Sequence, residues 1–201
     1  MNYRQLLEHD ELTKNQTTQI GQLLHNTDPF IFQCICKEEN ADLLGSLCQS
    51  GEDAVFALKN LFVGEESGKI CALLLWAKGP VRWDSKPLKK LSEKENKPLS
   101  PLLNMVQMDY FSEYQNVPPS VISIMNVCVE KDCRNRGIGT EMMKAFLDQH
   151  PNETMELFVL SDNSAAISVY SKLGFVIEED NLTAFTPDKN PAIRSKKMIR
   201  S

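Results

Sequence analysis

A β-strand pattern, a glycine-containing turn and a helical pattern follow one another directly between residues 121 and 149, and this order constrains the fold more than any other stretch. Residues 121–129 read VISIMNVCV, an apolar and β-branched run that is typical of a buried strand. Residues 134–139 read RNRGIG, and the apolar positions from 138 to 149 then repeat at helical spacing. The pattern predicts a strand at 121–129 and a helix at 138–149, joined by a tight turn.

Such a turn is suited to binding a phosphate group. The first backbone N–H groups of a helix have no carbonyl partner within it and carry partial positive charge. Gly137 and Gly139 would let the backbone approach an anion closely. Arg134 and Arg136 add fixed positive charge with forked donors. The alternative is an ordinary strand-to-helix turn without a ligand.

Three kinds of phosphate-binding loop can be compared with this turn. A nucleotide-hydrolase loop ends in Gly-Lys-Ser/Thr, which this turn lacks. A dinucleotide-binding loop needs G-x-G-x-x-G/A, but Met142 stands at the last of these positions and the acidic residue expected at a following strand end is missing. The third kind, R/Q-x-x-G-x-G/A, binds the pyrophosphate of coenzyme A, and Arg134-x-x-Gly137-x-Gly139 matches it in full.

The rest of the chain predicts strands and helices around this unit. Strands are expected at 3–8, 54–63, 69–77, 156–160 and from 175 onward, with a last strand that includes Met198 and Ile199, and helices at 12–24, 38–49 and 163–173. Gly174 stands where a helix commonly ends. The strand–helix–strand–helix–strand order from 121 to 178 predicts neighbouring strands that pair in parallel.

Residues 78–119 interrupt this pattern. Lysine, proline and glutamate are frequent from 86 to 101, which predicts a long loop with little core of its own. Apolar and aromatic residues then recur at helical spacing, which predicts a helix at 102–114. We expect a single domain over residues 1–201, with an extended loop-and-helix segment at 78–119.

Charge and composition exclude several functions. The net charge of −5 argues against a general nucleic-acid binder. The first residues lack the apolar core of a signal peptide, and the longest apolar run, 70–77, is too short to span a membrane, so we expect no membrane association. The six cysteines are expected as reduced thiols in the cytoplasm. Neither they nor the three histidines have the spacing of metal ligands, so no metal is expected.

A second motif lies downstream of the turn. Residues 163–175, NSAAISVYSKLGF, read as N-x-x-A-x-x-x-Y-x-K-x-G-F. With both motifs in this order and spacing, the chain resembles the Gcn5-related N-acetyltransferase (GNAT) family. The resemblance covers residues 121–178, and the first 120 residues add only a compatible order of strands and helices.

The resemblance implies an α/β (α+β) fold: a mixed, mostly antiparallel central sheet, flanked by helices, whose parallel central strands at 121–129 and 155–160 splay apart. It implies acetyl-CoA as the co-substrate, with its pantetheine arm between those strands. The positions that match the family's coenzyme-binding residues are Val127, Cys128 and Val129 for pantetheine, Arg134, Asn135, Arg136, Gly137, Ile138, Gly139 and Thr140 for the pyrophosphate, and Asn163 near the pantetheine. Asn163 also fits an ordinary helix N-cap.

Tyr170 matches the family's tyrosine near the coenzyme sulfur, which implies a general acid. In the implied reaction an amine attacks the thioester directly in a ternary complex, and the departing thiolate needs a proton. An ordinary tyrosine pKa of about 10 suits a thiol leaving group of about 8.5. A backbone N–H near residues 127–129 is expected to stabilise charge on the acyl oxygen. The alternative is that Tyr170 only packs on the sheet, because it follows Ala166 and Ile167 by one helical turn.

The group that takes the proton of the amine is not evident in the sequence. Some members of the family carry a glutamate near the start of strand 121–129, where this chain offers only Ser120, Ser123 and Asn126. Asp109 and Glu113 are candidates, with the solvated side of a helix as the alternative.

The acceptor is expected to be a small-molecule or peptide amine, because the acidic character of the chain favours a cation. The aromatic residues that would wall an acceptor pocket are Trp83, Tyr110, Phe111 and Tyr114. The segment that carries them has two other interpretations: a cover for the sheet, or a homodimer contact. A non-catalytic acyl-CoA sensor and acyl transfer to a non-amine acceptor also stay open.

Overall fold

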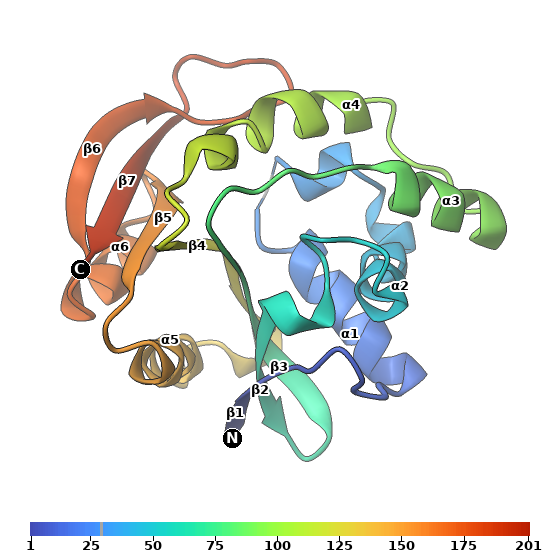
Figure 1. Cartoon of the computed structure of the whole chain (residues 1–201), viewed down its shortest axis with the longest axis horizontal. Helices are drawn as coiled ribbons and strands as arrows, with labels where there is room; N and C mark the ends of the chain where they lie inside the picture. The colour runs from blue at the N-terminus through green and yellow to red at the C-terminus, as the bar shows by residue number, and fades with distance from the viewer. Residues whose placement is uncertain (29) are drawn as a thin grey trace.

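Seven strands form one mixed sheet in the part of the chain that the structure describes (Figure 1). The computed structural model describes residues 1–28 and 30–201, and for residue 113 it describes the backbone alone. The strands are β1 Asn2–Gln5, β2 Leu61–Glu66, β3 Lys69–Lys78, β4 Val121–Val129, β5 Thr154–Leu160, β6 Val176–Thr183 and β7 Arg194–Arg200, in the order β1-β2-β3-β4-β5-β7-β6. β4 and β5 pair in parallel, and the other neighbouring pairs are antiparallel. The predicted fold class is confirmed.

Helices cover both faces of the sheet (Figure 1). α1 (Lys14–His25) and α2 (Asp42–Ser50) pack on one face, together with α3 (Lys86–Glu95) and α4 (Leu103–Met105) of the 78–119 segment. α5 (Ile138–Gln149) and α6 (Ser164–Lys172) pack on the other face. Short 3₁₀ turns lie at Phe32–Cys34, Glu38–Asn40, Leu58–Asn60, Glu113–Asn116 and Lys131–Cys133, and one π-helical turn lies at Val106–Tyr110.

The two parallel strands separate halfway along their length. Their ladder ends at Ile124 opposite Leu157. At the same point β4 bulges at Met125, which shifts its register against β3. Because a bulge bends a strand and increases its twist, β4 diverges from β5 beyond Ile124. The predicted splay of the parallel strands is thereby confirmed.

β4 and α5 occupy the residues that the sequence predicts. β4 is buried along most of its length because helices cover both sides of it, and this explains its continuous apolar run. Gly174, with φ +90°, follows the end of α6 in the left-handed conformation that its position predicts.

Three other predictions are wrong in detail. The strand predicted at 54–63 begins only at Leu61, because Asp53 accepts hydrogen bonds from the backbone N–H groups of Val55 and Phe56, both at 2.8 Å, and turns the chain. The loop predicted at 86–101 contains α3, which buries Leu88 and exposes its lysines. β6 is not a parallel neighbour of β5, because β7 inserts between them.

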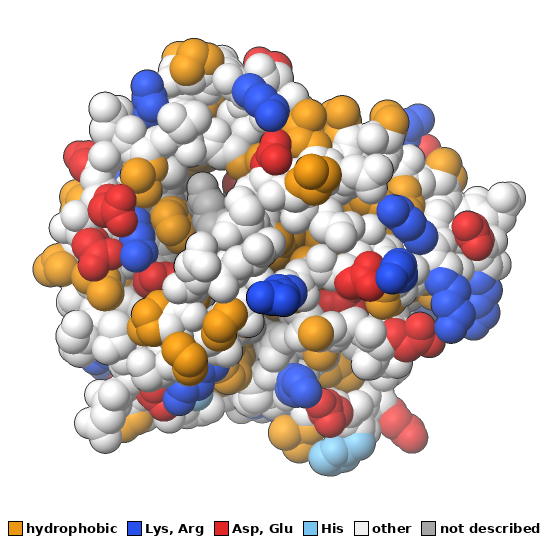
Figure 2. Space-filling model, turned by 45° about the horizontal axis from the view of Figure 1, so that its top comes forward, with side chains coloured by type: hydrophobic (Ala, Val, Ile, Leu, Met, Phe, Trp, Pro, Cys, Tyr) orange, Lys and Arg blue, Asp and Glu red, His pale blue; other side chains and the backbone are white. Residues whose placement is uncertain are grey.

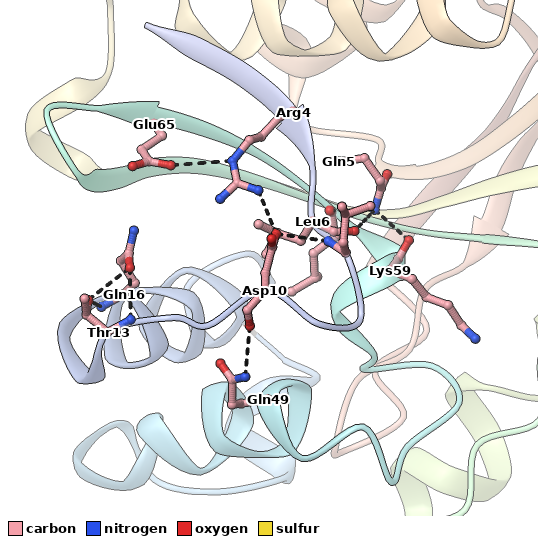
Figure 3. A network of polar contacts seen from close by, with 11 residues as sticks. Arg4, Gln5, Leu6, Asp10, Thr13, Gln16, Gln49, Lys59 and Glu65 are labelled. Carbon is pink, nitrogen blue, oxygen red and sulfur yellow. Dashed lines mark hydrogen bonds and ion pairs between the residues drawn. The ribbon is translucent and has the colours of Figure 1, made fainter.

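A polar network ties β1 to the helices that follow it (Figure 3). Arg4 contacts the carboxylate of Asp10 at 2.7 Å, and the backbone carbonyl of Asp10 accepts a hydrogen bond from Gln49 of α2 at 3.2 Å. Thr13 and Gln16 form a capping box at the start of α1. The network holds the start of α1, and the helix then delivers residues 26–28 to the side of β4.

Candidate active site

Two cavities meet where β4 and β5 diverge, and Val127 and Tyr170 line both of them. The helix-end groove, of about 380 Å³, is lined by Val127, Val129, Cys133, Arg134, Asn135, Gly137, Ile138, Gly139, Thr140, Met143, Ala166, Val169 and Tyr170. The aromatic cavity, of about 170 Å³, lies between the end of α1, β4, β5, the 78–119 segment and the loop between β6 and β7. A ligand in each cavity would approach the other at Tyr170.

The helix-end groove presents backbone N–H groups at the start of α5. Asn135 and Gly137 have left-handed backbones, with φ +60° and +78°, so the turn curls into the concave arrangement that binds anions. The first N–H groups of α5, at 138–140, have no carbonyl one turn earlier in the helix. A Cβ at Gly139 would lie 3.2 Å from Cγ2 of Val129, so glycine lets the helix pack closely against β4. This geometry suits a phosphate or pyrophosphate.

The two arginines of the turn have different surroundings. Arg134 lines the helix-end groove, and its Nε donates a hydrogen bond to the carbonyl of Val129 at 2.9 Å. Arg136 instead points to Glu66 at the end of β2, with Nη2 at 2.9 and 3.2 Å from the two carboxylate oxygens. Hydrogen bonding to Arg136 lowers the pKa of Glu66. Arg136 lies outside the groove lining and ties the turn to the sheet.

Tyr170 stands at the junction of the two cavities. Its ring packs against Phe175 of the core, with the ring centroids 6.1 Å apart. Within the described part of the chain, its hydroxyl makes no hydrogen bond. Burial raises the pKa of Tyr170 to about 12. The phenol is therefore neutral near pH 7 and keeps a proton that it can donate.

Residues 127–129 of β4 divide between the two faces of the strand. Val127 and Val129 line the helix-end groove, whereas the side chain of Cys128 is buried in the core on the opposite face. Burial raises the pKa of Cys128 to about 11, so it is a poor nucleophile. The described ladder with β5 ends at Ile124, which leaves the β5-facing backbone edge of 125–129 open to a ligand.

Asn163 caps α6, since its Oδ1 accepts a hydrogen bond from the N–H of Ala166 at 3.1 Å. It lines the aromatic cavity and not the helix-end groove. The N-cap interpretation is confirmed, and a contact with pantetheine stays a prediction.

The end of α1 contributes residues that the sequence did not single out. Thr27 donates from Oγ1 to the carbonyl of Leu24 at 2.8 Å and accepts from Asn126 Nδ2 at 3.0 Å, which joins this turn to the bulge of β4. Asp28 follows and lines the aromatic cavity. In the sequence, an aspartate before a proline predicts only the end of a helix. It does not reveal that Asp28 lines a cavity in the folded chain.

Asp28 is a half-buried carboxylate with one oxygen engaged. Its Oδ1 accepts hydrogen bonds from the backbone N–H groups of residue 30 at 2.7 Å and Ile31 at 2.8 Å. Burial raises the pKa of Asp28, although these two hydrogen bonds oppose the shift. A carboxylate in this setting attracts a cation and is a stronger base than an ordinary aspartate.

The 78–119 segment both covers the sheet and walls the aromatic cavity. Tyr110 and Tyr114 line the cavity. Trp83 and Phe111 are buried in the core beside Phe56, where Trp83 Nε1 donates to Asp53 at 2.9 Å. Two of the four predicted aromatic residues therefore line the cavity.

The loop between β6 and β7 lines the cavity through Ala184 and Phe185. In Figure 1 this loop reaches toward α4. Its Phe185 lines the cavity and lies 6.1 Å from Tyr110, centroid to centroid. Lys189 of the same loop pairs with Asp109 at 3.3 Å. Figure 2, in which this side is turned toward the reader, shows the surface hollowed and acidic and basic side chains interspersed.

Asn126 lines the aromatic cavity, but its side chain is an amide and cannot serve as the base. Asp109 is paired with Lys189 and lies outside the lining. The side chain of Glu113 lies outside the described part of the structure. Ser123 donates to the buried carboxylate of Glu156 at 2.8 Å, and neither residue belongs to the cavity lining.

Among the described residues, no group of three or more His, Cys, Asp or Glu side chains is placed to hold a metal ion. The helices of the described chain are too short or too polar to cross a membrane. The six cysteines are free thiols and buried.

The helix-end groove fits a coenzyme A group, because backbone N–H groups suited to a pyrophosphate share its lining with apolar residues and Tyr170. The Acetyltransferase (GNAT) family model matches residues 60–175. The chain belongs to the GNAT acetyltransferase family.

Relatives of known activity and solved structures agree with this assignment. Over 63 residues the chain is 35% identical to the L-amino acid N-acetyltransferase AaaT of Escherichia coli (strain K12), a match that spans 29% of this chain and 39% of that protein. The structure resembles an N-acetyltransferase from Staphylococcus aureus Mu50, with a TM-score of 0.64, 15% identity, and coverage of 99% of this chain and 100% of the other. It also resembles a chain of the NatC complex bound to Gag peptide and CoA, with a TM-score of 0.55, 14% identity, and coverage of 99% and 96%. These two structural likenesses concern the fold.

Proposed function

We propose that the protein is an N-acetyltransferase that transfers the acetyl group of acetyl-CoA to a primary amine, by direct attack in a ternary complex. The observation that carries the proposal is that the helix-end groove and the aromatic cavity share Val127 and Tyr170. In a member of the GNAT family, this junction is where donor and acceptor would meet.

The helix-end groove is the proposed coenzyme site. Backbone N–H groups from Asn135 to Thr140 would hold the pyrophosphate, with Arg134 at the rim. The open backbone edge at Val127–Val129 would pair with the pantetheine arm, with Asn163 near it. Acetyl-CoA supplies the acetyl group in activated form, as a thioester. We assign Arg136 to anchoring the turn through Glu66.

Tyr170 is the proposed general acid. Its pKa of about 12 keeps the phenol protonated near neutral pH. Transfer of that proton to a thiolate of pKa about 8.5 would cost roughly 5 kcal/mol in the resting site. We therefore infer that Tyr170 first donates a hydrogen bond to developing negative charge and releases the proton as the bond to sulfur breaks. The attacking nitrogen loses one proton as the amide forms, and an equivalent proton restores the phenol of Tyr170. A backbone N–H of β4 near Val127–Val129 is the proposed partner of the acyl oxygen.

Direct attack by the amine is favoured over transfer through a cysteine. The thiol of Cys128 is buried on the face of β4 opposite the helix-end groove, with a raised pKa. The two cavities instead allow both reactants to be bound at once.

We further propose that residues 1–201 act as one acetyltransferase domain in the cytoplasm. The single sheet through the chain and the six free, buried thiols support this proposal. The names of the relatives, an L-amino acid acetyltransferase and a complex with a peptide, support an amine as the acceptor.

The experiment is to incubate the protein with acetyl-CoA and a panel of polyamines, aminoglycosides, amino acids, peptides and simple amines. Free thiol is followed spectroscopically, and products are identified by mass spectrometry. We expect thiol release that depends on the acceptor, with acetyl recovered on nitrogen. Coenzyme binding without release by any acceptor would favour an acyl-CoA sensor, and acetyl on oxygen would favour a non-amine acceptor.

A further inference from the structure

The aromatic cavity has an uneven distribution of charge. It is lined by Thr27, Asp28, Ile31, Tyr110, Tyr114, Ile124, Met125, Asn126, Val127, Leu157, Phe158, Val159, Leu160, Asn163, Tyr170, Ala184, Phe185 and Ser195. Among these residues Asp28 alone carries a formal charge at pH 7. Lys189 of the adjoining loop lies outside the lining and is paired with Asp109. The cavity therefore favours a cation over an anion.

The charge of Asp28 is held in place by the backbone. Its Oδ1 accepts hydrogen bonds from the N–H groups of residue 30 and Ile31, whereas Oδ2 accepts none within the described part of the chain. Thr27, directly before it, is tied to Asn126 on the bulge of β4. The carboxylate of Asp28 thus has a defined position relative to β4, whose Val127 lines both cavities.

The remaining lining limits the size and nature of the acceptor. Tyr110, Tyr114, Phe158 and Phe185 present aromatic rings, and such faces attract both apolar groups and cations. A cavity of about 150 Å³ can hold a benzene-sized group, and this one has about 170 Å³. One ring or a short branched chain fills it.

Building on the proposed function, we propose that Asp28 binds the ammonium of an acceptor that carries one compact aromatic or apolar group and no carboxylate beside the amine. A free amino acid would bring its carboxylate close to Asp28, and the described lining offers no cation to compensate it. An ammonium beside one compact aromatic or apolar group is found both in a small arylalkylamine and at the N-terminus of a peptide. In either case the acceptor differs from the L-amino acids in the name of the Escherichia coli relative.

The test measures binding, so that it does not depend on turnover. 2-Phenylethylamine and L-phenylalanine differ by the carboxylate alone. Each is titrated calorimetrically into the full chain saturated with coenzyme A. We expect 2-phenylethylamine to bind at least about tenfold more tightly. A phenylalanyl-glycine peptide is titrated in the same way. Its affinity relative to that of 2-phenylethylamine tells whether the site prefers a peptide N-terminus or a small amine. Tighter binding of the peptide or of the amine than of phenylalanine supports the proposal.

Asp28→Asn separates charge from structure, because an asparagine Oδ1 can accept the same two backbone hydrogen bonds. We expect the variant to bind 2-phenylethylamine about tenfold more weakly and to lose most of the discrimination against phenylalanine. Asp84→Asn is the matched control: Asp84 also accepts a backbone hydrogen bond, from Lys86 at 3.0 Å, but is exposed and outside the cavity. Unchanged coenzyme A affinity in both variants verifies folding.

The outcomes separate this inference from the proposed function. Equal or tighter binding of phenylalanine, no binding of any of the three ligands, or an unchanged affinity in Asp28→Asn would each overturn the role of Asp28. If the amine binds through Asp28 but no thiol is released from acetyl-CoA with any acceptor, the role of Asp28 stands and the transferase proposal fails. If thiol is released with an amine acceptor at the same rate in the wild type and in Asp28→Asn, the transferase proposal stands and the role of Asp28 fails.

Discussion

The helix-end groove and the aromatic cavity are adjacent, but they are built in different ways. Most of the groove comes from one continuous stretch, Val127 to Met143, and the backbone N–H groups of the turn and of the first turn of α5 are its proposed ligand contacts. The cavity is assembled from the end of α1, two strands, the 78–119 segment and the loop between β6 and β7, and its character comes from side chains. A local motif can therefore define the proposed donor site, whereas the proposed acceptor site depends on how distant segments pack.

The helix-end groove and the aromatic cavity should also respond differently to substitution. A backbone site tolerates many side chains but depends on glycine geometry. A cavity lined by side chains changes in shape and charge when those residues change, and so changes the ligand that it accepts. We expect substitutions in the groove to weaken coenzyme binding generally, and substitutions in the cavity to change which amine is used.

The largest effect is expected where the two regions meet. Tyr170→Phe removes the hydroxyl but keeps the ring against Phe175. We expect kcat to fall by about 10²–10⁴-fold with little change in the affinity for acetyl-CoA, because only the proton donor is lost. The measurement is steady-state thiol release together with coenzyme titration. Tyr3→Phe is the control, since Tyr3 donates to Glu141 at 2.8 Å and lines neither cavity. Full activity of Tyr170→Phe would contradict the general-acid role.

A smaller loss is expected from disturbing the backbone of the groove. Gly137→Glu places a side chain at φ +78° and adds negative charge beside the proposed pyrophosphate site. We expect acetyl-CoA affinity to fall by about 100-fold, through strain and repulsion. Gly68→Glu imposes similar strain at φ +79° in the turn between β2 and β3, with open space around it, so it should leave affinity unchanged. Equal affinities for the two variants, measured by calorimetry, would disprove the phosphate site.

Asn163 tests the border between the two regions. Asn163→Ala removes the cap of α6 and should destabilise the protein by about 1 kcal/mol, or lower Tm by about 2–4 °C. Asn163→Ser keeps a capping oxygen but shortens the side chain. If Asn163 also contacts pantetheine, the serine variant keeps its Tm and loses coenzyme affinity. A serine variant that matches the wild type in both thermal unfolding and coenzyme titration would limit Asn163 to capping.

The smallest effect is expected on the thermal stability of the folded chain, which the buried charge of Asp28 lowers. Burial raises the pKa of Asp28 in the folded chain. The folded state therefore binds this proton more tightly than the unfolded state, and stability is lost as pH rises from the unfolded pKa of about 3.9 through the raised value. Asp28→Asn carries no such charge. The Tm of the variant minus the Tm of the wild type should therefore be larger at pH 7.5 than at pH 4. Thermal unfolding at both values checks this, and a Tm difference that shrinks with rising pH would contradict it.

Particular elements explain how much the sequence could predict. β4 and α5 were placed residue for residue, because an apolar run, a glycine turn and a helical repeat each have a local cause. α3 was missed because its many lysines obscure a short apolar face that meets the core only in the folded chain. Asp53 ended the predicted strand at 54–63 through hydrogen bonds that composition does not reveal.

The site divides in the same way. Val127, Val129, Arg134, Asn135 and Gly137 to Thr140 line the groove as the motif implies, but Arg136 does not, because Glu66 lies within reach only after β2 folds beside the turn. Tyr110 and Tyr114 line the cavity, whereas Asp109 pairs with Lys189, some 80 residues later in the chain. Asp28 was invisible as a site residue until α1 placed it beside β4.

By itself, the sequence determined the glycine turn that we propose to bind phosphate, the tyrosine at the next helix and membership of the GNAT family, because these depend on backbone conformations that neighbouring residues specify. The tertiary structure alone decided that β4 and β5 separate at Ile124, that Tyr170 stands between two cavities, and that Asp28 carries the charge of the second one. The physical reason is range: a helix end and a glycine turn are set by contacts a few residues apart, whereas the charge and shape of a cavity are set by segments that meet only when the core packs.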